Sequence, residues 1–298
     1  MKNVESALKD KEIWTGVKTL VISLGPTPRN SGLLRQLGHQ GIHAQMVQAV
    51  DGRSWAQPFD PRLVDVKRYL GVIGRMPSGP EIGCALSHLE CARQAKLSSA
   101  EYALVFEEDA NVVADLAPAV KAMRRIDSSK PTVLTLYAGP EPIFKRNSVE
   151  TEAVDKSAIV GQFYVPPVCT VAYLMNRAAI DVFASKPIVE GMSDWPPFAN
   201  QFKFWGYFPF PVAHTLDGST LETERNRLTL KTDHRTWFSS VVSSYLTLFR
   251  LSKMREHSRS VGGLRAYIIR VIGPRSLLCL RRFNQERRGS EPDWYWVG

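Results

Sequence analysis

Short runs of apolar, mostly β-branched residues alternate in the first half of the chain with longer segments whose apolar positions recur at helical spacing. The short runs, which we interpret as buried strands, are 19–24, 42–50, 102–106 and 132–137. The longer segments, which predict helices, are 30–39, 80–96 and 115–126. This strand–helix–strand order favours an α/β architecture with a mostly parallel central sheet.

The pattern is less regular in the following hundred residues. Residues 158–165 and 169–175 predict a hairpin-like pair of strands, and a helix is expected over 176–185. Residues 193–211 are crowded with Trp, Phe, Tyr and Pro. We expect this aromatic segment to form a loop that lines a pocket or groove.

Beyond Arg235, apolar residues at helical spacing are interleaved with Ser, Thr and Arg, first over 237–249 and again over 264–283. Basic amphipathic helices of this kind can lie in a membrane interface with their arginines on lipid phosphates. The alternative is that they pack on the rest of the protein and keep their arginines in water. The chain is therefore divided into a polar lead-in (1–16), a main domain (17–234) and a basic amphipathic helical C-terminal region (235–298).

The distribution of charge supports this division. The whole chain carries a formal charge of +9, but residues 225–298 hold fifteen Lys and Arg against five Asp and Glu, a net charge of +10. The first 224 residues have a net charge of −1. A nearly neutral main domain does not suit nucleic acid, and the basic region lacks nucleic-acid-binding motifs. An anionic membrane surface is the expected partner of the basic region, and no nucleic acid is expected.

The cysteines and the N-terminus indicate a cytoplasmic location. The four cysteines show no CxxC spacing, so we expect buried thiols in a reducing compartment rather than a zinc knuckle or a redox dithiol. No secretory signal is visible in the first residues, and no run of about 18 apolar residues predicts a membrane span.

Three acidic residues, Glu107, Glu108 and Asp109, directly follow the strand predicted at 102–106. Ligands bind at the carboxyl ends of strands in open α/β sheets. Glu107 and Asp109 are two residues apart, so they can point to the same side of an extended chain. Two hard oxygen ligands there would suit Mg²⁺ or Mn²⁺. The alternative is an acidic loop that begins a helix.

Several segments in a fixed order carry a resemblance to a known family. These segments are VISL (21–24), AVDG (49–52), EIGCALSH (81–88), LVFEED (104–109), AYLM (172–175) and SDW (193–195). Their order and spacing resemble glycosyltransferase family 25, whose members act in lipopolysaccharide and lipooligosaccharide biosynthesis. The EIGCALSH and LVFEED segments are the most specific of the set.

The resemblance implies a GT-A-like nucleotide-sugar-binding fold and an inverting transfer of a sugar, often galactose, from a UDP-sugar to a saccharide acceptor. The chain departs from the family pattern at two positions. Glu108 stands where the family usually has Asp, and Pro80 stands where it usually has Gly. The outer pair, Glu107 and Asp109, is kept, so metal binding is still expected.

In the light of the resemblance, Glu107 and Asp109 are expected to hold Mn²⁺ (or Mg²⁺), with His214 as a candidate third ligand. The alternative for His214 is a histidine on the surface or packed among aromatic residues. Inversion needs a base that takes the proton of the acceptor hydroxyl. Asp194 is the preferred base, and Glu108 and Asp217 are the other candidates.

The donor is expected to lie against the N-terminal half of the chain. Arg29 is the candidate for the diphosphate, and Asp51 is the candidate for ribose or uracil. Asp51 and Gly52 can equally form a simple turn, and His88 can equally be a structural histidine. The donor-binding set that the resemblance implies is Leu24, Arg29, Asp51, Gly52, Ser87, His88, Glu107 and Asp109.

The expected acceptor is an oligosaccharide or a lipid-linked saccharide, and the expected location is peripheral, on the inner membrane of a Gram-negative bacterium. The alternative is a catalytically lapsed family member that serves as a saccharide- or lipid-binding accessory protein. The Glu108 departure is its only sequence hint.

Overall fold

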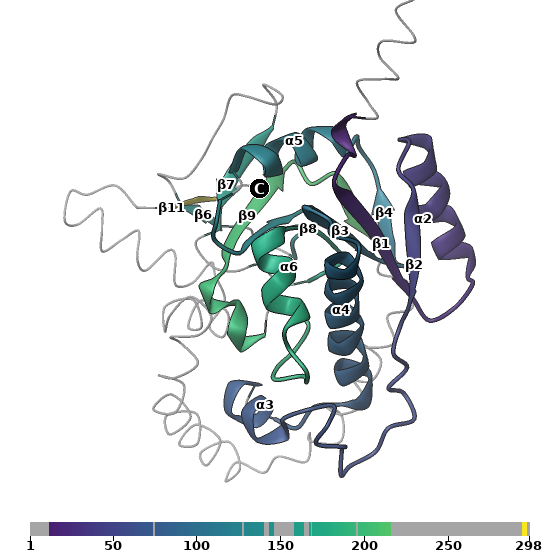
Figure 1. The fold of residues 1–298 in the computed structure, drawn as a ribbon, viewed down its shortest axis with the longest axis vertical. Coiled ribbons are helices and arrows are strands. Elements are labelled where there is room, and N and C mark those ends of the chain that lie inside the picture. Colours follow the sequence, from purple (N-terminus) through teal and green to yellow (C-terminus); the bar gives the residue numbers. More distant parts are fainter. Residues whose placement is uncertain are drawn as a thin grey trace, which may run out of the picture.

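The structure is a computed structural model, and it describes residues 12–73, 75–126, 128–139, 143–145, 158–163, 167, 169–194, 196–215 and 294–296. The described residues form an α/β arrangement in which helices cover both faces of a central sheet (Figure 1). The α/β class predicted from the pattern is confirmed.

The central sheet has seven strands in the order β2-β1-β3-β8-β5-β9-β7. Their bounds are β1 Val17–Ser23, β2 Ala44–Gln48, β3 Tyr102–Glu107, β5 Thr132–Thr135, β7 Ile159–Gln162, β8 Ala172–Asn176 and β9 Lys203–Phe208. Parallel pairing joins β2 to β1, β1 to β3 and β5 to β9. The strands β8 and β7 run against the other five. The sheet is therefore mixed, although most of its strands share one direction.

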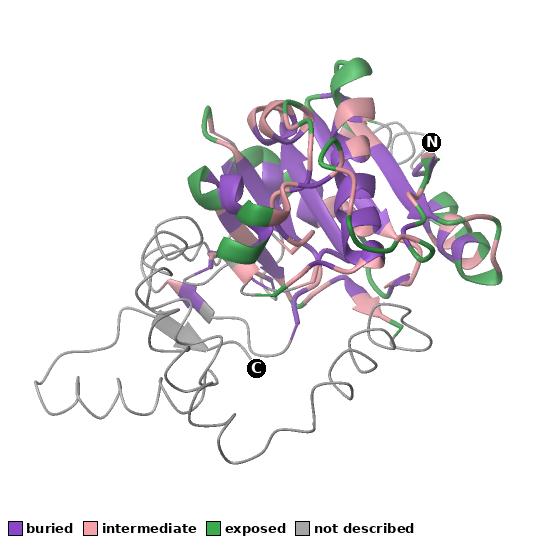
Figure 2. Ribbon diagram, turned by 90° about the horizontal axis from the view of Figure 1, so that it is seen from below, coloured by how far each residue is buried: buried purple, intermediate pink, exposed green. Residues whose placement is uncertain are grey.

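Each face of the sheet has its own layer of helices. The α-helices are α2 Pro28–His39, α3 Val66–Ile73, α4 Gly79–Leu97, α5 Ala117–Ile126 and α6 Arg177–Ala184. Alternate residues of β3 separate the two layers, because Val105 packs with α4 and α6 and Leu104 packs with α2 and α5. In Figure 2 the strands are buried and exposed positions gather on the helices.

The N-terminus of α4 is fixed by a buried acidic residue. Ser78 and Glu81 form a capping box, in which each side chain binds the other residue's backbone N–H. Glu81 is 4% exposed, and both of its oxygens accept hydrogen bonds from the guanidinium of Arg75. The hydroxyl of Tyr69 donates to the same carboxylate. These contacts tie α3 to the start of α4, with Pro80 in the first turn as its fixed φ allows.

The loop after β2 packs directly on the backbone of α4. A Cβ placed on Gly52 would lie 1.9 Å from the carbonyl oxygen of Gly79, and one placed on Gly83 would lie 2.3 Å from the oxygen of Val50. Only glycine permits this approach. The two glycines thus hold the loop that follows β2 against the first turns of α4.

One expectation for the second half of the chain is wrong, and a second is incomplete. The segments predicted as a hairpin do form strands, but β7 pairs with β9 at the edge of the sheet, and β8 lies between β3 and β5. All five residues of β8 are buried, as suits a strand with a neighbour on each side.

The aromatic segment 193–211 is also not simply a pocket-lining loop. It contains a 3₁₀ helix, η2 (Pro197–Gln201), and the strand β9. Phe204 and Tyr207 are buried in the core, and Trp205 is partly buried. Trp195 lies outside the described residues.

Two short antiparallel ladders accompany the sheet. The strand β4 (Ala110–Val112) pairs with β10 (Val212–His214), and β6 (Ile143–Lys145) pairs with β11 (Trp294–Trp296). Residues 294–296 of the region predicted to be helical are therefore a strand. The rest of that region, which includes Cys279, lies outside the described residues, and so does the candidate base Asp217 of the main domain. Within the described residues, no helix is long and apolar enough to cross a membrane.

Candidate functional site

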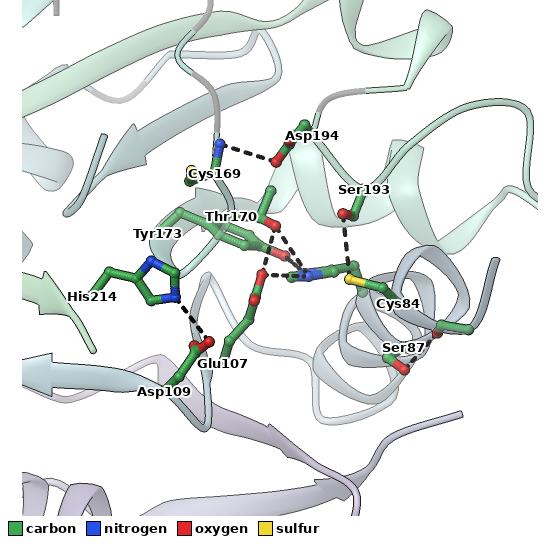
Figure 3. Close-up of polar contacts among 12 residues, drawn as sticks. Cys84, Ser87, Glu107, Asp109, Cys169, Thr170, Tyr173, Ser193, Asp194 and His214 are labelled. Carbon is green, nitrogen blue, oxygen red and sulfur yellow. Dashed lines mark hydrogen bonds and ion pairs between the residues drawn. The ribbon is translucent and has the colours of Figure 1, made fainter. Parts of the chain in front are cut away.

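The acidic residues 107–109 stand at the carboxyl edge of the sheet. Strand β3 ends at Glu107, and Ile22 of β1 is its partner in the parallel register. The turn formed by Glu108 and Asp109 then leads into β4. In Figure 3 the side chains of Glu107 and Asp109 extend from this loop to the same side.

One oxygen of Glu107 is held from two directions. Oε1 lies 3.1 Å from Nε2 of His88 and accepts a hydrogen bond of 2.7 Å from the hydroxyl of Thr170. Burial by itself raises the pKa of Glu107, but the hydrogen bonds from His88 and Thr170 place the net pKa below its usual value. Glu107 is therefore an anion near neutral pH.

The second nitrogen of His88 is also engaged. His88 is 3% exposed in α4, and its Nδ1 lies 2.8 Å from the hydroxyl of Tyr173 in β8. Burial raises the pKa of Tyr173 well above its usual value, so this phenol keeps its proton. The outcome is a buried chain of contacts from Tyr173 through His88 to Glu107.

Asp109 meets His214 because the β4–β10 ladder places His214 opposite Ala110. The Nε2 of His214 lies 2.9 Å from Oδ2 of Asp109. The ring of His214 also packs edge-on against Tyr137, with 5.7 Å between the ring centroids. Both interpretations of His214 from the sequence thus have a counterpart, since it contacts the acidic loop and it packs on an aromatic ring.

Each of the two outer carboxylates keeps one oxygen for another ligand. Oδ1 of Asp109 is buried and has no hydrogen-bond partner among the described residues. Both contacts of Glu107 are to Oε1, which leaves Oε2 available. A buried carboxylate oxygen without a partner is costly unless a ligand satisfies it. Oδ1 of Asp109 is such an oxygen, and together with Oε2 of Glu107 it fits a hard divalent cation such as Mn²⁺ or Mg²⁺.

Glu108 points to a different group. Its Oε2 accepts a hydrogen bond from the hydroxyl of Ser23 at the end of β1. The same hydroxyl accepts a hydrogen bond of 2.9 Å from the amide of Asn30 in α2. Leu24 and Arg29, both exposed, flank this group in the sequence. Glu108 therefore connects the acidic loop to the loop between β1 and α2.

Asp194 holds a strained backbone next to the site. Its Oδ1 accepts a hydrogen bond of 3.0 Å from the backbone N–H of Cys169, which has a φ of 75°. Non-glycine residues rarely adopt this left-handed conformation, and they persist in it only where their surroundings fix it. Thr170, which binds Glu107, is the next residue. Asp194 thus helps to hold the segment that contacts the acidic loop.

A second group of possible metal ligands overlaps the first. One ligand atom each from Cys84, His88 and Glu107 lie within 4.8 Å of one another. Burial, and then the charge of Glu107, raises the pKa of Cys84, so its thiol stays protonated. The Sγ of Cys84 lies 3.4 Å from the hydroxyl of Ser193, and His88 already uses both nitrogens. This trio fits a hard cation less well than the oxygens of Glu107 and Asp109.

The remaining residues of the predicted donor-binding set lie near the carboxyl edge but contact protein groups. Ser87 accepts a hydrogen bond from the backbone N–H of Val50 and donates to the oxygen of Gly83. Asp51 is exposed, and hydrogen bonds from Arg53 lower its pKa to about 2. Gly52 packs on α4 as described above.

Sequence reasoning missed two residues of the site. Thr170 precedes β8 and carries no recognisable motif. Tyr173 lies in the AYLM segment, but a short apolar run of this kind predicts only a strand. Both reach Glu107 because β8 pairs with β3, and Val171 accepts the backbone N–H of Glu107. No local pattern in the sequence predicts that β8 pairs with β3.

An aromatic-lined hollow lies beside the first turn of α4. This pocket, of about 270 Å³, is formed around Trp55, Phe59, Leu63 and Ile82, with the carboxylate of Asp60 at its wall. Residues of the aromatic segment 193–211 line a separate pocket, in which Ser193, Pro196 and Phe198 lie beside Ala85 and His88 of α4.

Comparison with known proteins identifies related sequences. The sequence model described as glycosyltransferase family 25 (LPS biosynthesis protein) matches residues 17–186. A curated relative from Rattus norvegicus, named "Probable inactive glycosyltransferase 25 family member 3", is 26% identical over 184 residues, which cover 57% of this chain and 30% of the relative. The chain thus spans less than a third of that relative. A crystal structure of A197 from STIV aligns over 55% of this chain and 66% of that one, with 9% identity and a TM-score of 0.30.

Proposed function

The chain belongs to glycosyltransferase family 25, and we propose that it transfers a sugar, most simply galactose, from a UDP-sugar to a saccharide acceptor with inversion at the anomeric carbon. In this proposal the α/β domain is GT-A-like, and the carboxyl edge of β1, β2 and β3 receives the nucleotide. The acceptor belongs to lipopolysaccharide or lipooligosaccharide biosynthesis.

The buried, unpartnered Oδ1 of Asp109 is the observation that carries the proposal. Together with Oε2 of Glu107 it would bind Mn²⁺ or Mg²⁺. A divalent ion there would stabilise the negative charge that develops on the departing diphosphate. His214 would orient Asp109 through its contact with Oδ2, and it is also the candidate third ligand of the ion.

Asp194 is the proposed base for the acceptor hydroxyl, and Glu108 is the alternative. Asp194 has one oxygen on the backbone of Cys169, so it is held in place as a base must be. Glu108 already accepts a hydrogen bond from the Ser23 hydroxyl. Asp194→Asn should therefore lower the rate of transfer more than Glu108→Gln does, while both variants keep UDP binding.

The donor is proposed to run from the acidic loop towards the β1–α2 loop. Arg29 would bind the diphosphate, with Leu24 beside it. Asp51 would accept hydrogen bonds from the ribose or uracil in place of its present contact with Arg53. Ser87 and Gly52 would act indirectly, by shaping the loop after β2.

For the acceptor we propose the hollow around Trp55 and Phe59, since aromatic faces pack on sugar rings and Asp60 can accept hydrogen bonds from hydroxyls. Six residues of α4 separate Ile82, in the hollow, from His88, which is a rise of about 9 Å. Trp55→Ala should raise the acceptor KM and leave hydrolysis of the donor unchanged.

The test of the proposal is UDP release from UDP-galactose and UDP-glucose, with and without Mn²⁺. We expect metal-dependent release that falls by about 100-fold or more in Glu107→Gln and in Asp109→Asn. Asp115→Asn, which changes an exposed aspartate in the next loop, is the matched control. If UDP release is independent of Mn²⁺ and is unchanged by both substitutions, the proposal is wrong.

The second candidate is a catalytically lapsed member that binds saccharide or lipid. The name of the rat relative and the Glu108 departure favour it. Calorimetric binding of UDP without transfer to any saccharide acceptor would support this candidate over an enzyme.

The basic region completes the proposal. With a net charge of +10 over residues 225–298, it would hold the protein on the anionic cytoplasmic face of the inner membrane, where a lipid-linked saccharide acceptor is presented.

A further inference from the structure

The contacts of Glu107 determine where the protons of the buried chain lie. A glutamate is ionised at neutral pH, and an ionised carboxylate only accepts hydrogen bonds. Nε2 of His88, 3.1 Å from Oε1 of Glu107, must therefore be the protonated nitrogen. In a neutral imidazole the other nitrogen, Nδ1, is then an acceptor, and the hydroxyl of Tyr173 at 2.8 Å is the group that donates to it.

Strand β8 and the residues before it act on Glu107 in two ways. Thr170 donates to Oε1 directly, and Tyr173 acts through His88. Tyr173 lies opposite Val105 in the β3–β8 ladder. Val105 precedes Glu107 by two residues in β3. The carboxylate is thus fixed from the neighbouring strand and from α4, and Oε2 is the oxygen left for a ligand.

We propose that Tyr173 is a positioning residue for the acidic loop: by donating to Nδ1 it holds His88 in the tautomer that grips Oε1 of Glu107, so that Oε2 faces the bound cation and the diphosphate. The link to a cation rests on the function proposed above. The tautomer of His88 does not depend on that function.

The phenol hydroxyl is the part of Tyr173 that matters. Tyr173→Phe keeps the ring in the core and removes the donor to Nδ1, so His88 gains freedom to change tautomer and Glu107 loses its fixed orientation. Partners of this kind, one step behind a metal ligand, typically alter metal affinity by about 10-fold or more. We expect the Kd for Mn²⁺ to rise by about 10-fold, and the rate at saturating Mn²⁺ to change much less.

Tyr69→Phe is the matched control. Tyr69 is 0% exposed, and its hydroxyl also donates to a carboxylate, that of Glu81 at the start of α4. The two variants lose the same group from equally buried rings, but only Tyr173 contacts His88. Tyr69→Phe should therefore leave the affinity for Mn²⁺ unchanged, even where it lowers the melting temperature.

The first measurement is the tautomer of His88 in the full chain, by NMR of a sample with ¹⁵N-labelled histidine. The chain has six histidines, and His88→Gln identifies the signals of His88. In the wild type we expect Nε2 protonated and Nδ1 unprotonated, and in Tyr173→Phe a mixture of tautomers. A wild-type ring protonated at Nδ1, alone or together with Nε2, would overturn the proposal without the need for any variant.

The second measurement is Mn²⁺ affinity by electron paramagnetic resonance for the wild type, Tyr173→Phe and Tyr69→Phe. An equal loss of affinity in both variants, or none in Tyr173→Phe, would contradict the positioning role. If the wild type binds no Mn²⁺ and releases no UDP, the proposed function fails, and the tautomer measurement alone decides the role of Tyr173.

Discussion

Single residues in the acidic loop are distinguished by which of their oxygens is already occupied. Glu107 and Asp109 each give one oxygen to a histidine, His88 or His214. Glu108, between them, accepts from Ser23 instead. Of three consecutive acids, two thus keep an oxygen for the proposed cation, and the third binds a side chain of the protein. The substitution that departs from the family pattern falls on the last of these.

Ser87 tests whether a motif residue binds the donor or supports the fold. Ser87 is 1% exposed, and its hydroxyl is the acceptor for the backbone N–H of Val50. Ser87→Ala leaves that buried N–H without a partner, which costs about 1–3 kcal/mol. We expect urea denaturation to show this loss while the donor KM stays unchanged. A large rise in the donor KM with no loss of stability would mean that Ser87 binds the donor.

Cys84 should be a slow nucleophile in spite of its place beside the site. Burial, followed by the charges of Glu107, Asp194 and Asp109, raises the pKa of its thiol, and only the thiolate reacts. At pH 8 we expect iodoacetamide to alkylate Cys84 at least about 10-fold more slowly in the native protein than in the urea-unfolded chain. Mass spectrometry of the modified peptides measures both rates. Rapid alkylation of the native protein would show that the thiol is ionised.

At the scale of elements, α4 is the part that aligns the site. Its first turns are packed on the loop after β2, and His88, in its middle, contacts Glu107. The EIGCALSH segment therefore serves both purposes, because Glu81 and Gly83 fix the helix and His88 reaches the acidic loop. A resemblance in sequence does not separate these roles.

Substitution of Gly83 tests the close approach of the loop to α4. A Cβ at this position would lie 2.3 Å from the oxygen of Val50. Gly83→Ala should lower the free energy of unfolding by about 1–3 kcal/mol or more, because a close-packed backbone must move. Gly71→Ala in α3 meets nothing within 4 Å and should raise it by about 0.5–1 kcal/mol. Thermal unfolding of the two variants measures these changes in stability. Equal effects of Gly83→Ala and Gly71→Ala would contradict the close approach of the loop to α4.

The ion pair of Glu81 with Arg75 should matter more than one on the surface. Glu81 has a side-chain exposure of 3% and Arg75 of 42%. Breaking a fully buried pair costs about 3–5 kcal/mol, and the partial exposure of Arg75 reduces the expected loss for Glu81→Gln to about 2–3 kcal/mol. Asp60→Asn breaks a comparable contact with the exposed Arg62 and should change little. Guanidinium denaturation distinguishes the two, and similar midpoints would show that the buried pair adds no stability.

At the scale of the whole molecule, the sheet and its short ladders bring together residues that are far apart in sequence. His214 reaches Asp109 across 105 positions because β10 pairs with β4. Tyr173 reaches His88 across 85 positions because β8 lies beside β3. The family match covers residues 17–186, so Asp194 and His214 come from beyond the matched segment.

The basic region gives a prediction for the entire chain. Because residues 225–298 carry a net charge of +10, the full chain should float with anionic liposomes, and increasing salt should weaken the association. A chain that ends at residue 234 should stay at the bottom of the gradient. Equal flotation of both chains would assign membrane binding to the main domain.

The sequence by itself determined the elements of this protein and the position of its acids. A run of β-branched residues, a helical period or a Pro–Glu helix start is a local pattern, so the strands β1, β2, β3 and β5 and the helices α2, α4, α5 and α6 could be predicted. The acids at 107–109 follow a strand, and a strand's end lies at a sheet edge wherever that strand is placed.

Only the tertiary structure decided which strands are neighbours and which side chains meet. The pattern of apolar residues in a strand indicates which of its faces is buried, but it does not identify the neighbouring strands. The strands β7 and β8 were therefore predicted to form a hairpin, although each pairs with other strands. The same reason hid Thr170 and Tyr173, which reach Glu107 through the β3–β8 pairing. It also hid the proton assignment of His88, because that depends on two partners, on different strands, that no local pattern connects.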